Sequence, residues 1–167
     1  IHAGDGYLRN DGQRVELDIS GNLEEYGYYD LHVKQLFKKV FDLDIKPRSF
    51  LSRRTYGFVI RDIRVVSFLH EIGFPYGNKS FILKVPTFIL NSDDFAILSA
   101  FLRGLFDTDG YLGFRRYYGK TYKPFKVKYP TYPTISLTTI SEMLAEDVMS
   151  ILQKLEFNFN YYSYQPK

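Results

Sequence analysis

Two aspartates in matching surroundings are the residues of this chain best suited to chemistry. Asp5 lies in the run Gly-Asp-Gly-Tyr-Leu over 4–8, and Asp109 lies in Thr-Asp-Gly-Tyr-Leu over 108–112, 104 positions later. Two carboxylates brought side by side repel each other unless a cation neutralises them. Because oxygen ligands without cysteine favour Mg²⁺ over zinc, the pair predicts a magnesium site.

Other metal and nucleophile chemistries fit the sequence poorly. The chain has no cysteine, which excludes a disulfide framework, a thiolate zinc site and a cysteine nucleophile. Its three histidines, at 2, 32 and 70, lack the spacing of zinc ligands. An EF-hand loop that started at Asp107 would need glycine and glutamate where Leu112 and Tyr118 stand.

The distribution of charge points to a polyanionic partner. The net charge is only +3, but 111–141 holds six basic residues and no acidic one, and 46–64 holds six basic residues against Asp62 alone. Neutralising phosphates with such side chains releases condensed counterions. Aromatic residues make up 18% of the chain, so these charges are expected on a folded surface. No apolar run is long enough to span a membrane and no secretory signal is visible, so we expect no membrane association and a cytoplasmic location with access to DNA.

Hydrophobic spacing predicts the elements that position the two aspartates. Alternation with period two indicates strands, whereas apolar residues three and four apart indicate helices. The predicted strands are 14–20, 49–52, 55–61, 111–118, 125–129, 134–140 and 158–164. The predicted helices are 30–41, 63–72, 91–108 and 142–155.

The order of these elements repeats after each aspartate. Each Asp-Gly-Tyr-Leu run is followed by two strands and then a helix, which indicates a tandem repeat. We expect a first repeat at 1–90, lacking most of its first helix, and a second at 91–167 that is cut short, together forming one domain. Gly104 and Thr108 share one face of the second repeat's first helix, where small residues allow another helix backbone to approach closely.

The residues Phe101–Gly110, with the sequence Phe-Leu-Arg-Gly-Leu-Phe-Asp-Thr-Asp-Gly, resemble the LAGLIDADG motif of homing endonucleases. Ile1–Gly6 is similar to the C-terminal half of the same motif. The resemblance implies an α+β fold with two pseudo-symmetric αββαββα-type repeats. Their curved antiparallel sheets would form a DNA-binding saddle, with the motif helices packed at the centre of a monomer.

The resemblance also implies roles for individual residues. Asp5 and Asp109 match the family's catalytic metal-binding acids, and the backbone carbonyls of Gly4 and Thr108 would add ligands. Lys84, before Val-Pro at 85–86, resembles a lysine that lies close to the attacking water in the family. The cofactor would be Mg²⁺ or Mn²⁺, and Ca²⁺ would support DNA binding without cleavage.

Strand alternation separates a core face from a DNA face. The residues expected to point into the core are Leu8, Val15, Leu17, Leu112, Phe114, Phe125, Val127, Ile135 and Leu137. Basic and polar side chains on the opposite face suit the edges of bases in the major groove, and the cluster at 120–128 suits phosphates. The residues assigned to DNA binding are Arg9, Arg14, Arg53, Arg54, Arg115, Arg116, Tyr117, Lys120, Lys123, Lys126 and Lys128.

The function implied is that of a sequence-specific endonuclease acting on double-stranded DNA. It would cut a long target site in an allele that lacks the intron or intein, by metal-dependent phosphodiester hydrolysis. The alternative is a relative that does not cleave DNA, either an RNA-splicing maturase that binds intron RNA or a DNA-binding regulator. The layout of two motifs in one chain occurs both in stand-alone archaeal enzymes and in inteins, and the sequence leaves that choice open.

Two basic residues of the second repeat are expected to respond differently to substitution. Arg115→Ala should relax base preference at particular positions of the target, because a bidentate arginine–guanine contact contributes about 1–3 kcal/mol of discrimination. Lys123→Ala should weaken binding to all duplexes alike and lower the salt slope by about one. Binding selections from random duplexes test this expectation. It would be contradicted if both variants lost the same affinity for every duplex, whatever its sequence.

Overall fold

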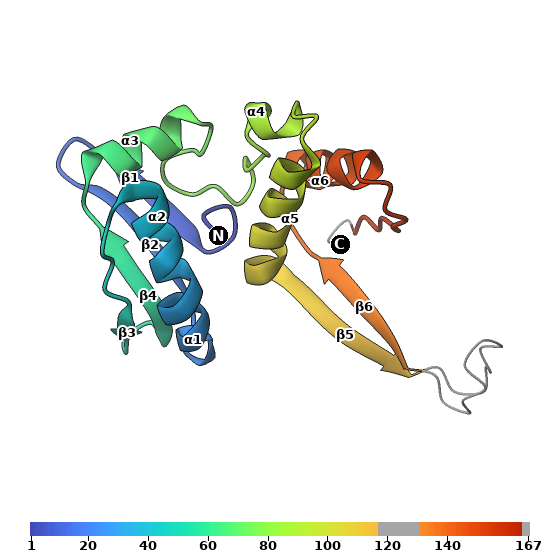
Figure 1. Cartoon of the computed structure of the whole chain (residues 1–167), viewed down its shortest axis with the longest axis horizontal. Coiled ribbons are helices and arrows are strands. Elements are labelled where there is room, and N and C mark those ends of the chain that lie inside the picture. Colours follow the sequence, from blue (N-terminus) through green and yellow to red (C-terminus); the bar gives the residue numbers. More distant parts are fainter. Residues whose placement is uncertain (117–130, 165–167) are drawn as a thin grey trace.

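The computed structural model of the chain describes residues 1–116 and 131–164, with the backbone alone at 115–116 and 131–132. Figure 1 shows two halves, one built on strands β1 to β4 and the other on helices α5 and α6 with strands β5 and β6. The N-terminus and α5 face each other between the halves. The predicted α+β character, with antiparallel sheets, is therefore confirmed.

The first half contains a four-stranded antiparallel sheet in the order β1-β2-β4-β3. Its strands are β1 (Gly6–Asn10), β2 (Val15–Asn22), β3 (Arg48–Phe50) and β4 (Thr55–Ile60). Leu8 pairs with Leu17, and Leu17 pairs in turn with Ile60. Leu8 and Leu17 are fully buried, which confirms the predicted alternation and leaves the other face of this sheet polar.

Helices cover the apolar face of this sheet. One continuous helical segment comprises the 3-10 turn η1 (Leu23–Glu25), α1 (Tyr26–Tyr28), the π-helical turn η2 (Tyr29–Val33) and α2 (Lys34–Phe41). The helix α3 (Ile63–Glu71) completes the layer. The segment starts earlier than predicted because Asn22 and Glu25 form a capping box at its N-terminus. Tyr29, Val33 and Phe37 point into the core with Phe58 of β4.

The second half begins with the short helix α4 (Thr87–Leu90) and the motif helix α5 (Phe95–Asp109). β5 (Gly110–Arg116) and β6 (Thr131–Leu137) then form a two-stranded antiparallel ladder, and α6 (Glu142–Lys154) follows. Asp94 caps α5, so the helix starts at Phe95, four residues after the predicted start at Asn91. The predicted strand 125–129 lies outside the described residues, as do Phe125 and Val127.

Two predictions for the second half are wrong. Residues 158–164 form no strand, because no described segment pairs with them to satisfy their backbone groups. Leu112, Phe114 and Ile135 do not enter a core but are 57–69% exposed. In the described part of the chain β5 and β6 pair only with each other, and Figure 1 shows them projecting away from the helices. Alternation in the sequence thus predicts a strand but not what covers it.

A segment that follows α3 joins the two halves. Leu83 and Val85 in this segment are buried, and both are held by α6. The hydroxyl of Ser141 donates to the carbonyl of Leu83 at 2.5 Å, and the carboxylate of Asp147 accepts from the Val85 N–H at 2.9 Å. None of the described helices has the length and hydrophobicity needed to cross a membrane.

Ser141→Ala is expected to lower the free energy of unfolding by about 1–3 kcal/mol. The serine is 1% exposed, and its hydroxyl also accepts from the Leu144 N–H at the start of α6. The variant therefore loses a helix cap and leaves the Leu83 carbonyl without its donor. Urea unfolding measures the change, with the exposed Ser163→Ala as the matched control. Equal stability of the two variants would show that the Ser141 hydroxyl does not stabilise the contact between the Leu83 segment and α6.

Candidate active site

The backbone at Gly4 lies against the end of the motif helix α5. A Cβ atom at this position would clash with Oγ1 of Thr108 and lie 3.0 Å from Oδ2 of Asp109. One turn earlier on α5, the backbone nitrogen of Ile1 donates to the carbonyl of Gly104 at 3.1 Å. Gly104 and Thr108 thus face the first motif, as their spacing predicts, and the contact brings Asp5 and Asp109 to the same place.

Asp5 lies half-buried between β1 and the helical segment. The hydroxyl of Tyr29 donates to Oδ2 of Asp5 at 3.1 Å, from the π-helical turn. The carboxylate of Glu25 is adjacent, since a Cβ at Gly21 would clash with Oε2 of Glu25 and lie 2.9 Å from Oδ2 of Asp5. Burial raises the pKa of Asp5 to about 6, with the Tyr29 hydrogen bond acting against it and Glu25 adding to it.

Asp109 is the last residue of α5 and has different partners. Burial also raises its pKa above the ordinary value, whereas the nearby charge of Lys79 acts to lower it. The other motif acid, Asp107, points elsewhere. It lies 3.8 Å from Nε of Arg103 and accepts a long hydrogen bond from Tyr28. Asp5 and Asp109, the two acids near Gly4, therefore have different surroundings.

Lys79 is the basic residue that the structure brings to this site. Its Nζ donates to the carbonyl oxygens of Gly4 and Gly6, at 2.7 and 2.5 Å. Burial lowers the pKa of Lys79, while the charges of Asp109 and Asp5 act to raise it. Sequence spacing does not identify Lys79, because its position depends on a contact between distant parts of the chain. Lys79 follows a turn at Gly77, and the Gly77 N–H donates to the Leu8 carbonyl of β1.

Lys84, the lysine assigned from the sequence, lies five residues further along the same segment. It is exposed, and no hydrogen bond or ion pair joins it to Asp5 or Asp109 among the residues described. Tyr29 and Glu25 were not assigned either. For Glu25 a signal existed, because Asn22 and Glu25 have the spacing of a capping box, but nothing in that spacing points toward Asp5.

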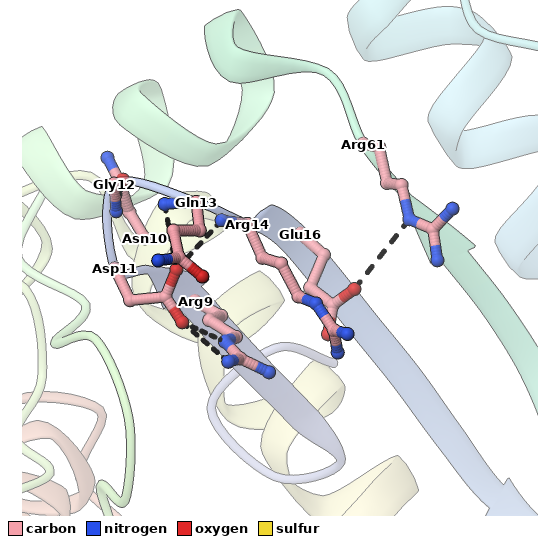
Figure 2. A network of polar contacts seen from close by, with 8 residues as sticks. All are labelled: Arg9, Asn10, Asp11, Gly12, Gln13, Arg14, Glu16 and Arg61. Carbon is pink, nitrogen blue, oxygen red and sulfur yellow. Dashed lines mark hydrogen bonds and ion pairs between the residues drawn. The ribbon is translucent and has the colours of Figure 1, made fainter.

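The DNA-binding candidates of the first half lie on or beside the polar face of the four-stranded sheet. Figure 2 shows Arg9 paired with Asp11, whose other oxygen accepts the Arg14 N–H at 2.8 Å, and Glu16 3.7 Å from Arg61. Asp11 fixes the backbone and the Arg9 guanidinium at the hairpin between β1 and β2, whereas Glu16 pairs with Arg61, which follows β4. The face is therefore preorganised and carries both signs of charge.

The remaining candidates divide into described and undescribed residues. Arg53 pairs with Asp18 at 2.6 Å and lies over the ring of Phe50, and Arg54 is exposed in the turn between β3 and β4. Arg115 and Arg116 end β5, where only the backbone is described. The candidates outside the described residues are Tyr117, Lys120, Lys123, Lys126 and Lys128.

The atoms near Gly4 that could ligate a metal, which are carboxylate and carbonyl oxygens, fit a hard cation such as Mg²⁺. Two carboxylates that burial disfavours as anions gain from a nearby cation. Within the described ranges no three His, Asp or Glu side chains are grouped to hold a metal by themselves. Coordination at this site would therefore need backbone carbonyls such as those of Gly4 and Thr108, with further oxygens from a substrate.

Comparisons with known proteins support the motif. A family described as the LAGLIDADG-like domain matches residues 96–166. The chain is also 33% identical over 135 residues to the replicative DNA helicase DnaB of Rhodothermus marinus. That match covers 75% of this chain but only 13% of the helicase.

The raised pKa values predict how stability depends on pH. Folding raises the Asp5 pKa from 3.8 to about 6. At a pH between these two values, Asp5 is therefore still largely protonated in the folded protein but already ionised in the unfolded chain. Without divalent ions, the free energy of unfolding should therefore fall as the pH rises from about 4 to 7. Asp5→Asn should remove part of that fall, and urea unfolding at both pH values measures it. The exposed Asp93→Asn serves as the control, and an equally steep fall in Asp5→Asn would contradict the assignment.

Proposed function

Because residues 96–166 match the LAGLIDADG-like domain, the chain belongs to the LAGLIDADG homing endonuclease family, and we propose that it is a metal-dependent, sequence-specific double-strand DNA endonuclease. The observation that carries the proposal is the contact of Gly4 with Thr108 and Asp109. This contact gathers one acid from each motif beside a single lysine. A pair of neighbouring carboxylates with raised pKa values and a cationic neighbour suits hydrolysis of a phosphodiester and has no comparable use in a purely DNA-binding regulator.

In this proposal, Asp5 and Asp109 hold Mg²⁺ or Mn²⁺ together with the carbonyls of Gly4 and Thr108. The bound ion would supply a Lewis acid and a water of lowered pKa. Tyr29 fixes the orientation of the Asp5 carboxylate by donating to one of its oxygens. The ammonium of Lys79 lies where it can stabilise negative charge that develops on a phosphate. Lys84 remains a second candidate for that role, and its exposed position leaves it free to reach DNA.

The polar face of the first sheet is proposed as the surface that reads one half of the target. Arg9 and Arg53 are held by Asp11 and Asp18, so their guanidinium groups are oriented before DNA arrives. Oriented arginines suit bidentate contacts with guanine in the major groove. We propose that Arg14 and Arg54 add to this surface, and that β5 with the basic residues from Arg115 to Lys128 reads the other half.

The proposed architecture is one monomeric domain with two pseudo-symmetric repeats, at 1–90 and 91–167, that form a saddle over double-stranded DNA. The observed order supports it, since each motif is followed by an antiparallel pair of strands and then a helix. The protein would act inside the cell on DNA.

An intein origin is the proposed context. The similarity to the DnaB helicase occupies three quarters of this chain but about an eighth of the longer protein. A short stretch of similarity within a much longer chain is the pattern that an inserted domain produces. The target would then be an allele that lacks the insertion.

Selection of duplexes from a random DNA library in Ca²⁺, followed by exchange into Mg²⁺, tests the proposed function. One long, weakly symmetric consensus that is then cut on both strands is the expected result. A consensus that binds but is never cut would contradict the endonuclease and favour a regulator. Absence of any enriched duplex, with binding to intron RNA instead, would favour a maturase.

Asp5→Asn and Asp109→Asn should each abolish double-strand cleavage while leaving DNA binding in Ca²⁺ intact. Loss of a residue that merely supports a metal ligand already lowers metal affinity or activity about 10–100-fold. Loss of a ligand itself should therefore exceed that range. Asp93→Asn is the matched control, and cleavage by either site variant at the rate of this control would refute the assignment.

A further inference from the structure

Lys79 donates to the very carbonyl oxygen that the proposed metal site needs. Its Nζ lies 2.7 Å from the Gly4 oxygen and also bonds the Gly6 oxygen, so one side chain bridges two backbone carbonyls around Asp5. A divalent ion on the Gly4 oxygen would lie next to this ammonium. Two cations that share one acceptor repel each other strongly in a partly buried site.

The position of Lys79 also changes the charge that a metal ion would meet. Both Asp5 and Asp109 lie close enough for their charges to act on Lys79, and Lys79 in turn acts to lower the pKa of Asp109. The ammonium therefore neutralises part of the acid pair in the metal-free protein. A pair that already has an internal cation gains less from an external one.

We propose that Lys79 is an internal counter-ion that competes with the divalent ion for the Gly4 carbonyl and the acid pair, so that it weakens metal binding in the absence of DNA. The inference rests on the metal site of the proposed function. It concerns affinity rather than chemistry, and it assigns Lys79 a role opposite to that of a metal ligand.

The geometry lets Lys79 yield without leaving the site. Its backbone carbonyl accepts from the N–H groups of Ile82 and Leu83, so the main chain of the turn is fixed. Its side chain has two acceptors, and it can keep the Gly6 oxygen when a metal takes the Gly4 oxygen. DNA phosphates would bring the additional negative charge that both cations need. Lys79 would thereby make tight metal binding depend on DNA.

The inference is tested by titrating the full chain with Mn²⁺ in the absence of DNA. The EPR signal of the free ion measures how much Mn²⁺ remains unbound. Lys79→Met should lower the Kd for Mn²⁺ at least about tenfold, because it removes a like charge a few ångströms from the site. Lys79→Arg keeps the charge and should bind Mn²⁺ as weakly as the wild type. Lys154→Met is the matched control, since Lys154 also donates to a backbone carbonyl, that of Leu90 at 2.7 Å, and its Kd should not change.

Unchanged or weaker binding of Mn²⁺ by Lys79→Met would overturn the inference. If Lys79→Met fails to fold, Lys79→Gln replaces it, because a neutral amide can still donate to both carbonyls. Asp5→Asn separates this result from a failure of the proposed function. Binding that requires Asp5 but ignores Lys79 would overturn only the counter-ion role. Binding that is insensitive to Asp5→Asn would refute the metal site itself, and the counter-ion role with it.

Discussion

The arrangement of this protein depends on one close contact, that of the Gly4 backbone with the end of α5. There is no room for a side chain at position 4, because Thr108 and Asp109 occupy that space. This packing determines the surroundings of both acids. It places the two acids near each other, removes enough water from them to raise their pKa values, and sets the Gly4 carbonyl within reach of the Lys79 ammonium.

The surroundings of the two acids differ more than a repeated motif suggests. Asp5 is held by a tyrosine hydroxyl and adjoins a glutamate, both from the helical segment of the first half. Asp109 has neither partner among the described residues, and its strongest charged neighbour is Lys79. The repeat therefore fixes where the acids lie, while elements outside the repeated motif determine how each acid behaves.

Local patterns predicted the parts of this structure that local interactions determine. Alternation placed Leu8 and Leu17 in the core, and the recurrence of Asp-Gly-Tyr-Leu identified the acid pair that packing brings together. Lys79 escaped prediction because its position depends on a loop tied to β1 across the fold. The apolar alternation of β5 and β6 misled for a related reason, since burial needs a partner that the strand itself does not encode.

The hydrogen bonds that hold Leu83 and Val85 against α6 limit how freely either half could be replaced by the corresponding half of another protein, in evolution or in design. The turn that carries Lys79 comes directly before Leu83 and Val85. Lys79 therefore acts on the acids of both motifs, while the residues that hold the segment after it, Ser141 and Asp147, belong to the second half. A chimera that joins the first half to a foreign second half would inherit the lysine without its anchors. Recombination at the boundary between the repeats would thus disturb the placement of Lys79 beside the two acids.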